Sequence, residues 1–120
     1  MNEYVIMTDS LSNLTEEMLA SYDIHVISDV DRFFSAFEQV LKQGKDVLFI
    51  GLSSAVSKTT GEARRAAESL DLFYPSNSVF VVDSVNTALG EGFLAKKAAL
   101  LRAAGKSIFD VVSWIEKPIR

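Results

Sequence analysis

Residues 46–50 read DVLFI, and this run predicts the kind of sheet on which the protein is built. Its last four residues are all apolar, without the alternating polar residues of a strand in a one-sided sheet. Such a run is typical of a strand that helices cover on both faces. We therefore expect a parallel sheet with this strand at its centre.

Three further strand-like runs, at residues 4–7, 24–27 and 78–82, alternate with helix-like runs. Alternation of this kind favours βαβ units, and right-handed crossovers then place helices on both faces of the sheet. The predicted fold class is α/β: a three-layer α/β/α sandwich of the Rossmann-like or flavodoxin-like kind. We expect about four parallel strands in the order 2-1-3-4, with the strand at residues 78–82 buried like the central one.

Short-range signals predict where helices begin and end. Asn13 with Glu16 three residues later predicts the start of the first helix, and Ser107 with Asp110 the start of the last. Gly44 ends the second helix in the position that glycine prefers. Helical spacing predicts three inward-facing stripes: Phe33, Phe34, Phe37, Val40 and Leu41; Ala63, Ala66, Ala67 and Leu70; and Ile108, Val111, Val112 and Ile115.

Length and composition exclude several classes of protein. A chain of 120 residues fits one domain, residues 1–120, and its net charge of −4 with scattered basic residues argues against nucleic-acid binding. The absence of cysteine excludes disulfides and thiolate chemistry and fits a cytoplasmic location. We expect no signal peptide and no membrane span. A mean hydropathy of +0.18 predicts some apolar surface that faces a ligand or a partner.

Polar residues stand at the carboxyl ends of three of the predicted strands. They are Asp9 and Ser10 after the first strand, a Ser-rich loop after the third, and Asp83 and Ser84 after the fourth. Ligands of open parallel sheets bind beyond the carboxyl ends of the strands. We therefore expect these residues to form one rim.

The Ser-rich loop at residues 52–60 is the strongest candidate for a binding site. Hydroxyl groups beside the free N–H groups of a helix start bind anions, so a carboxylate or a phosphate suits the loop. Plain capping of the helix by Ser54 or Ser57 explains the same residues. The residues alone leave these two interpretations open.

Other candidate sites are weaker. Asp9 and Asp83 form a pair of carboxylates that suits Mg²⁺ or acid–base catalysis, but such residues more often hold the N–H groups of nearby loops. His25 is the only histidine, so we expect a structural role and no metal. A phosphoacceptor receiver domain needs an Asp at the end of its third strand, and Gly51, Leu52 and Ser53 stand there. We expect no cofactor and no catalytic residue.

Several blocks together resemble the DegV family of fatty-acid-binding proteins. They are VIMTDS at residues 5–10, IGLSSAVSKT at 50–59, and VVDS at 81–84 followed by LGEG at 89–92. The resemblance covers nearly the whole chain and implies the N-terminal lobe of the family. It implies that the protein binds a long-chain fatty acid, is not an enzyme, and presents the fatty-acid carboxylate to a fatty-acid kinase subunit.

The resemblance also implies roles for particular residues. Those expected to hold the carboxylate are Ser53, Ser54, Ser57 and Thr59. Those expected to shape the rim are Asp9, Ser10, Asp83 and Ser84.

The chain departs from the family in three ways. It resembles a truncated domain, because the second lobe that closes over the lipid is missing. The segment after residue 27 lacks an insertion that contains a Thr-Ser-Gln-Pro-Ser motif, and Lys58 stands where the family has glycine. Losing half of the enclosure of a long acyl chain reduces the binding free energy by about 5 kcal/mol, which lowers the affinity several thousandfold.

We therefore expect weakened lipid binding by a monomer. A homodimer that covers exposed apolar surface would restore part of it. Two alternatives remain: a minimal or engineered α/β scaffold without a specific ligand, and phosphate or nucleotide binding at the Ser-rich loop.

Overall fold

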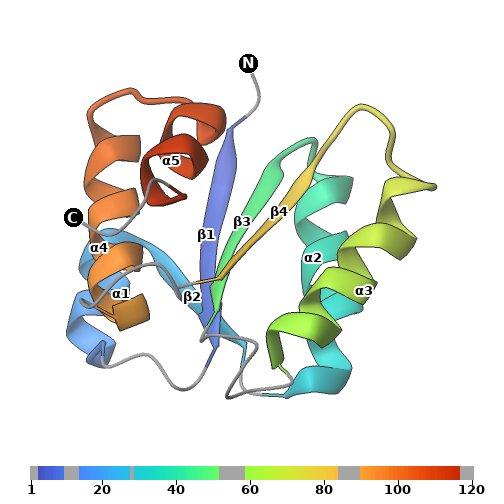
Figure 1. Ribbon diagram of the computed structural model, residues 1–120, viewed down its shortest axis with the longest axis horizontal. Helices are drawn as coiled ribbons and strands as arrows, with labels where there is room; N and C mark the ends of the chain where they lie inside the picture. The colour runs from blue at the N-terminus through green and yellow to red at the C-terminus, as the bar shows by residue number, and fades with distance from the viewer. Residues whose placement is uncertain (1–2, 10–13, 28, 52–58, 84–89, 117–120) are drawn as a thin grey trace.

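A four-stranded parallel sheet forms the centre of the protein (Figure 1). The computed structural model describes residues 3–9, 14–27, 29–51, 59–83 and 90–116. The strands of this part of the chain are β1 (Tyr4–Asp9), β2 (Ile24–Ile27), β3 (Asp46–Gly51) and β4 (Val79–Asp83). Their order is β2-β1-β3-β4, and every neighbouring pair is parallel. Both the predicted order and the predicted direction are confirmed.

Helices cover both faces of the sheet and complete the predicted three layers. In Figure 1, α2 and α3 lie on one side of the sheet, and α1, α4 and α5 lie on the other. The helices are α1 (Glu16–Tyr22), α2 (Phe33–Lys42), α3 (Thr59–Asp71), α4 (Gly90–Ala103) and α5 (Ile108–Ile115), and a 3₁₀ turn (Val30–Arg32) precedes α2.

The central strand β3 is buried along its whole length, as its sequence predicts. Leu48 and Ile50 pack against α4 and α5, whereas Val47 and Phe49 pack against α2 and α3. The Phe49 ring centroid lies 5.1 Å from that of Phe33 and 5.9 Å from that of Phe37. These three aromatic side chains anchor α2 on the sheet.

Two of the predicted helix signals are confirmed and one is wrong. Ser107 and Asp110 form a capping box, with Ser107 Oγ accepting from the Asp110 amide at 3.1 Å. Gly44 follows α2 with a φ of +78°, a conformation that glycine adopts without strain. The cap of α1, however, is Thr15, whose hydroxyl accepts from the Met18 amide at 3.1 Å.

Two predictions of burial need correction. Phe34 is 40% exposed, because it is one residue, or about 100°, away from the stripe that contains Phe33 and Phe37. Strand β4 is only partly buried apart from Val82, because it lies at the edge of the sheet.

Candidate functional site

The carboxyl ends of three neighbouring strands lie at one edge of the sheet. Asp9 ends β1, Gly51 ends β3 and Asp83 ends β4, and Gly51 is directly opposite Asp83 in the register. Thr8 is opposite Ile50, so the end of β1 is level with the end of β3. We call this edge, with the first turn of α3, the carboxyl rim.

Two of the predicted rim residues differ in how they are exposed. Asp9 is only 2% exposed, and the neighbouring Thr8 is fully buried. Asp83 is half-buried at the end of the edge strand. A carboxylate is buried in a folded protein only when it is paired or hydrogen-bonded, so the burial of Asp9 indicates a structural role within the rim.

A close contact holds the start of α3 against the end of β3. A Cβ atom added to Gly51 would lie 2.5 Å from Thr60 Oγ1 and 2.9 Å from a ring carbon of Phe49. Thr60 itself is fully buried. Only glycine at position 51 lets α3 approach so closely. The contact joins the residue before the Ser-rich loop, Gly51, to the last residue of that loop, Thr60.

Reasoning from sequence missed the pairing of Gly51 with Thr60. The glycine at the end of an apolar strand is the one signal in the sequence, because an isolated glycine in a strand often marks a close approach of other groups. Its partner, nine residues away, is visible only in the folded protein.

Five of the eight predicted site residues lie outside the described residues: Ser10, Ser53, Ser54, Ser57 and Ser84. Lys58 lies there as well. The described three are Asp9, Asp83 and Thr59, and Thr59 is the half-buried first residue of α3. All three are at the carboxyl rim, and their role in binding stays a prediction.

A partly apolar hollow lies next to the carboxyl rim. Its volume is about 460 Å³, and its walls are the end of β2, the following turn and α2. It is lined by Val26, Ile27, Asp29, Arg32 and Ala36. Ile27 is opposite Asp9 in the sheet, so the hollow adjoins the end of β1.

His25 is a partly exposed residue of β2 that has a partner close by in the chain. Its side chain is 55% exposed, and Nε2 lies 3.2 Å from a carboxylate oxygen of Asp23. Among the described residues, no group of three His, Cys, Asp or Glu side chains is arranged to hold a metal ion. In the same part of the chain, no helix is long and apolar enough to cross a membrane.

Comparisons with known proteins identify a family. A family profile described as uncharacterised protein, DegV family, matches residues 28–119. A DegV domain-containing protein of Clostridium perfringens is 40% identical over 86 residues, which are 72% of this chain and 30% of that protein. One of Clostridium acetobutylicum is 28% identical over 156 aligned positions, covering 99% of this chain and 54% of the relative.

Solved structures share the fold at low sequence identity. DegV from Bacillus subtilis, described as a fatty acid binding protein, superposes with a TM-score of 0.81 at 22% identity. That match covers 97% of this chain and 53% of the solved chain. A stearic acid-binding protein from Eubacterium ventriosum gives a TM-score of 0.82 at 17% identity, covering 94% of this chain and 52% of that one.

The chain spans about half, or less, of the length of the curated relatives that it matches. Because the alignment to the C. acetobutylicum protein has 156 positions and this chain has 120 residues, at least 36 positions have no counterpart here. The family profile begins to match at residue 28, directly after β2. The chain therefore belongs to the DegV family, and it forms one α/β unit that spans about half of the family's solved chains.

Proposed function

We propose that this protein binds a long-chain fatty acid, with the carboxylate at the carboxyl rim. The observation that carries the proposal is the meeting of three strand ends with the first turn of α3, which Gly51 and Thr60 hold in close contact. Membership of the DegV family and the fold shared with proteins described as fatty-acid-binding support it.

The chemistry of the rim suits a carboxylate. The first N–H groups of a helix have no partner within the helix, and its dipole favours a negative charge there. Thr59 begins α3, and Ser53, Ser54 and Ser57 precede it in the chain. We assign these four hydroxyl groups to the fatty-acid carboxylate.

The acidic residues of the rim have a different role in this proposal. Asp9 and Asp83 would repel a carboxylate that lay directly against them. Asp9 is nearly fully buried, which supports a role in holding the rim together. We assign Asp9, Ser10, Asp83 and Ser84 to shaping the rim.

The acyl chain requires apolar surface beside the carboxylate. The hollow formed by β2 and α2, with Val26, Ile27 and Ala36 among its walls, adjoins the rim and offers such surface. Since the chain spans about half of its solved relatives, we propose weaker binding than a fully enclosed acyl chain would have. The protein would act as a carrier for a fatty-acid kinase subunit, with no catalytic step of its own.

Native mass spectrometry and thermal unfolding test the proposal. A co-purified long-chain fatty acid, or stabilisation by palmitate or oleate, is expected. Palmitate at ten times its dissociation constant contributes about 1.4 kcal/mol, or roughly 5 °C for a domain of this size. The variant Thr59→Val should lose most of that shift, whereas Ser69→Ala, an exposed change on the same helix, should keep it.

The alternatives predict different results in the same experiment. Stabilisation by phosphate or a nucleotide, without any response to fatty acids, would support an anion site of another kind. No response to any of these ligands, together with protein that purifies without lipid, would support a scaffold that has no specific ligand.

A further inference from the structure

The outer edge of β4 is largely apolar and has no strand beside it among the described residues. In the described part of the chain β4 has a neighbour on one side only, which is β3. Its residues Val79–Val82 include no lysine, proline or other residue of the kind that protects the edges of sheets, and the one charged residue of the strand, Asp83, stands at its end. An apolar edge with a charge only at its end favours pairing with another strand.

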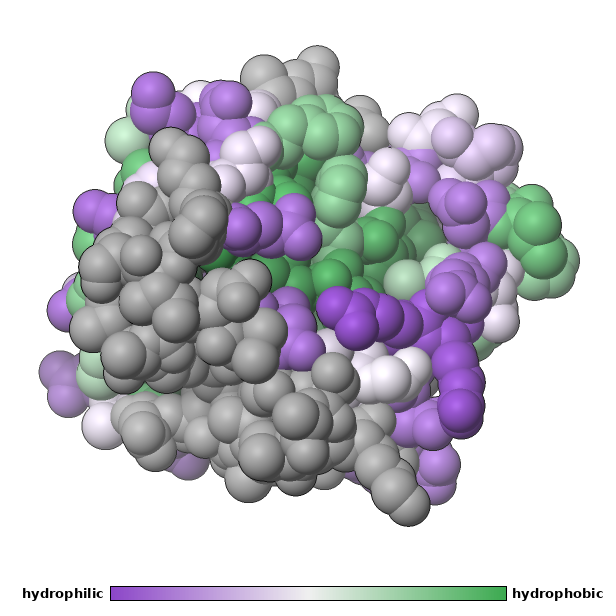
Figure 2. Space-filling view, in the orientation of Figure 1, coloured by the Kyte–Doolittle hydropathy of each residue, from purple (hydrophilic) through white to green (hydrophobic). Residues whose placement is uncertain are grey.

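Apolar side chains surround this edge. Figure 2 shows a hydrophobic patch in the middle of the face, between the two layers of helices, and β4 is at the front edge of the sheet in this orientation. Val79, Phe80 and Val81 are partly exposed. Phe109 of α5 is 57% exposed, and its ring packs edge-on against Phe80 with the centroids 5.4 Å apart.

We propose that a second copy of this chain covers the edge. The two β4 strands would pair antiparallel about a two-fold axis perpendicular to the sheet, joining two four-stranded sheets into one. This inference concerns a surface other than the carboxyl rim and does not depend on lipid binding.

One register satisfies both faces of the joined sheet. Phe80 and Val82 face α4 and α5, whereas Val79 and Val81 face α2 and α3. Pairing Phe80 with the partner's Phe80 places Val79 opposite the partner's Val81, so that each residue meets one from the same face. Asp83 then lies opposite the partner's Asn77, which keeps the two Asp83 carboxylates at opposite ends.

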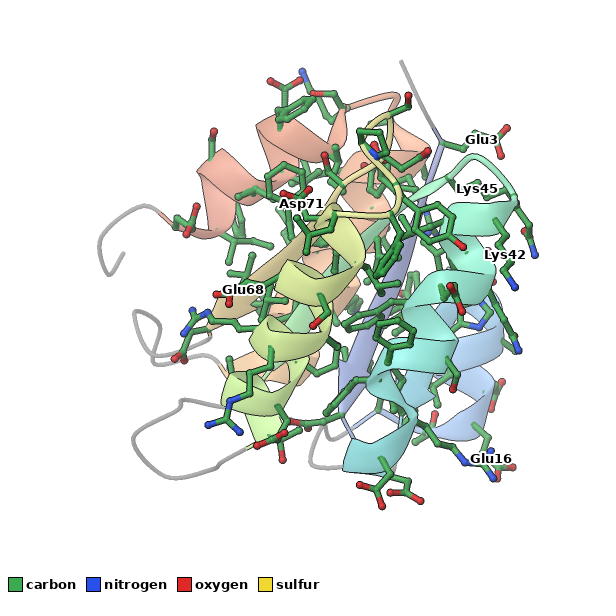
Figure 3. The ribbon with its side chains drawn as sticks, turned by 90° about the vertical axis from the view of Figure 1, so that its right-hand side faces the viewer. Glu3, Glu16, Lys42, Lys45, Glu68 and Asp71 are labelled. Atoms are coloured by element: carbon green, nitrogen blue, oxygen red, sulfur yellow. The ribbon has the colours of Figure 1, made fainter. Side chains whose placement is uncertain are left out.

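Charges on α3 identify a second copy as the occupant. Arg64, Glu68 and Asp71 are exposed and follow one another at spacings of four and three, so they form a row along one flank of the helix. Glu68 and Asp71 line a hollow of about 250 Å³ together with Val79 and Phe80, so this flank faces β4. Figure 3 shows Glu68 on the side of α3 that points away from α2.

The proposed two-fold axis makes the two ends of this row, Arg64 and Asp71, complementary to each other, whereas the Glu68 carboxylates of the two copies lie near the axis and repel each other more weakly than the two ion pairs attract. An axis through Phe80 passes beside Ala67 and Glu68, because these residues line the same hollow. The α3 helices of the two copies then run antiparallel, and Arg64 of each lies near the partner's Asp71. Two reciprocal ion pairs would form across the axis, although each chain carries a net charge of −4.

Charge reversal tests the arrangement by analytical ultracentrifugation. Arg64→Glu and Asp71→Arg should each weaken the dimer by about tenfold or more, and the double variant should restore most of the loss. Arg65→Glu is the matched control, because Arg65 lies on another flank and pairs with Glu62 within its own chain. It should leave the dimer unchanged.

Crosslinking locates the axis independently. The chain contains no cysteine, so a single introduced cysteine reports one position. Glu68→Cys should be joined to its partner by a short bismaleimide, whereas Ser69→Cys, on the opposite flank of α3, should not. Protein that stays monomeric at every concentration would overturn the proposal and leave the edge to an extended peptide or a lipid. A dimer that is insensitive to both charge reversals would overturn it as well.

Discussion

Substituting Gly51 by alanine tests whether the contact between β3 and α3 is as close as the structure has it. The new methyl group would lie 2.5 Å from Thr60 Oγ1 and 2.9 Å from the Phe49 ring, both well inside normal van der Waals separation. Thr60 and Phe49 are fully buried, so neither can move into solvent. Overpacking of this kind costs about 1–3 kcal/mol, which is roughly 4–12 °C in Tm for a domain of this size.

A matched glycine on α3 provides the control. An added Cβ at Gly61 would meet no atom within 4 Å, so Gly61→Ala tests the same chemical change without the clash. Because alanine favours a helix over glycine, Gly61→Ala should stabilise the protein by about 0.5–1 kcal/mol. The two variants should therefore shift the unfolding transition in opposite directions.

Urea unfolding followed by circular dichroism measures both variants, and a double-mutant cycle assigns the cause. Thr60→Ala removes the oxygen atom that the new methyl group would meet, so Gly51→Ala should cost less in that background than in the native one. A variant Gly51→Ala that is as stable as the native protein would refute the reasoning. Equal losses in the two backgrounds would show that Thr60 is not the obstacle.

Three further predictions follow from named contacts. Burial, with a smaller contribution from Asp110, raises the pKa of Tyr4 against the opposing effect of Arg102, and its hydroxyl donates to the Lys106 carbonyl at 2.8 Å. A raised pKa means that the folded state retains the proton, so this stability is present below about pH 10 and is lost as the pH rises further. Tyr4→Phe should therefore lower the free energy of unfolding by about 1 kcal/mol at neutral pH. In urea titrations at rising pH, the variant should lose less stability above about pH 10 than the native protein does. An equal loss in the two proteins would contradict the assignment. Thr15→Ala should cost about 1 kcal/mol of stability by removing the cap of α1, whereas Asn13→Ala should have little effect. Urea unfolding midpoints in the reverse order would show that Asn13 is the cap. Phe33→Ala should cost about 3–5 kcal/mol of stability, because the Phe33 ring is 1% exposed and packs on Phe37 and Phe49. Phe34→Ala should cost far less, because Phe34 is 40% exposed. Equal losses in thermal unfolding would show that both rings lie in the core.

The relation to the family bears on two separate features of lipid binding, which are the position of the carboxylate and the enclosure of the acyl chain. The rim is formed by strand ends within this α/β unit, and Thr59, which is proposed to hold the carboxylate, begins α3 at the rim. Enclosure of the acyl chain is a separate matter, because this chain spans about half of its solved relatives. Affinity for lipid therefore tests enclosure, whereas the position of the carboxylate tests the rim.

Local signals in the sequence were sufficient for most of the elements. The apolar run at residues 46–50 predicted a central strand, because only a strand covered on both faces has no need for polar residues. The capping pair of Ser107 and Asp110 and the glycine after α2 were also correct. Each of these features depends on residues within one turn of each other, and so they can be read without the fold.

Burial at the edges of the fold could not be read in this way. The run VFVV at residues 79–82 is as apolar as the central strand, yet β4 is half-exposed because no described strand pairs with its outer edge. Phe34 is as apolar as Phe33 but faces outward, since the direction of a side chain depends on where the helix meets the sheet. The cap of α1 moved from Asn13 to Thr15 because neighbouring residues offered similar hydroxyl and amide groups.

The sequence by itself determined the α/β class, the parallel sheet and the family, because these depend on the order of apolar runs and on short blocks of residues. Only the tertiary structure decided which residues meet across the chain. It buried Asp9 at the predicted rim while leaving Asp83 half-buried, set Thr60 against Gly51, and left β4 at an edge beside the charged row of α3. Such contacts join residues that are far apart along the chain, and their geometry is set by how whole strands and helices pack.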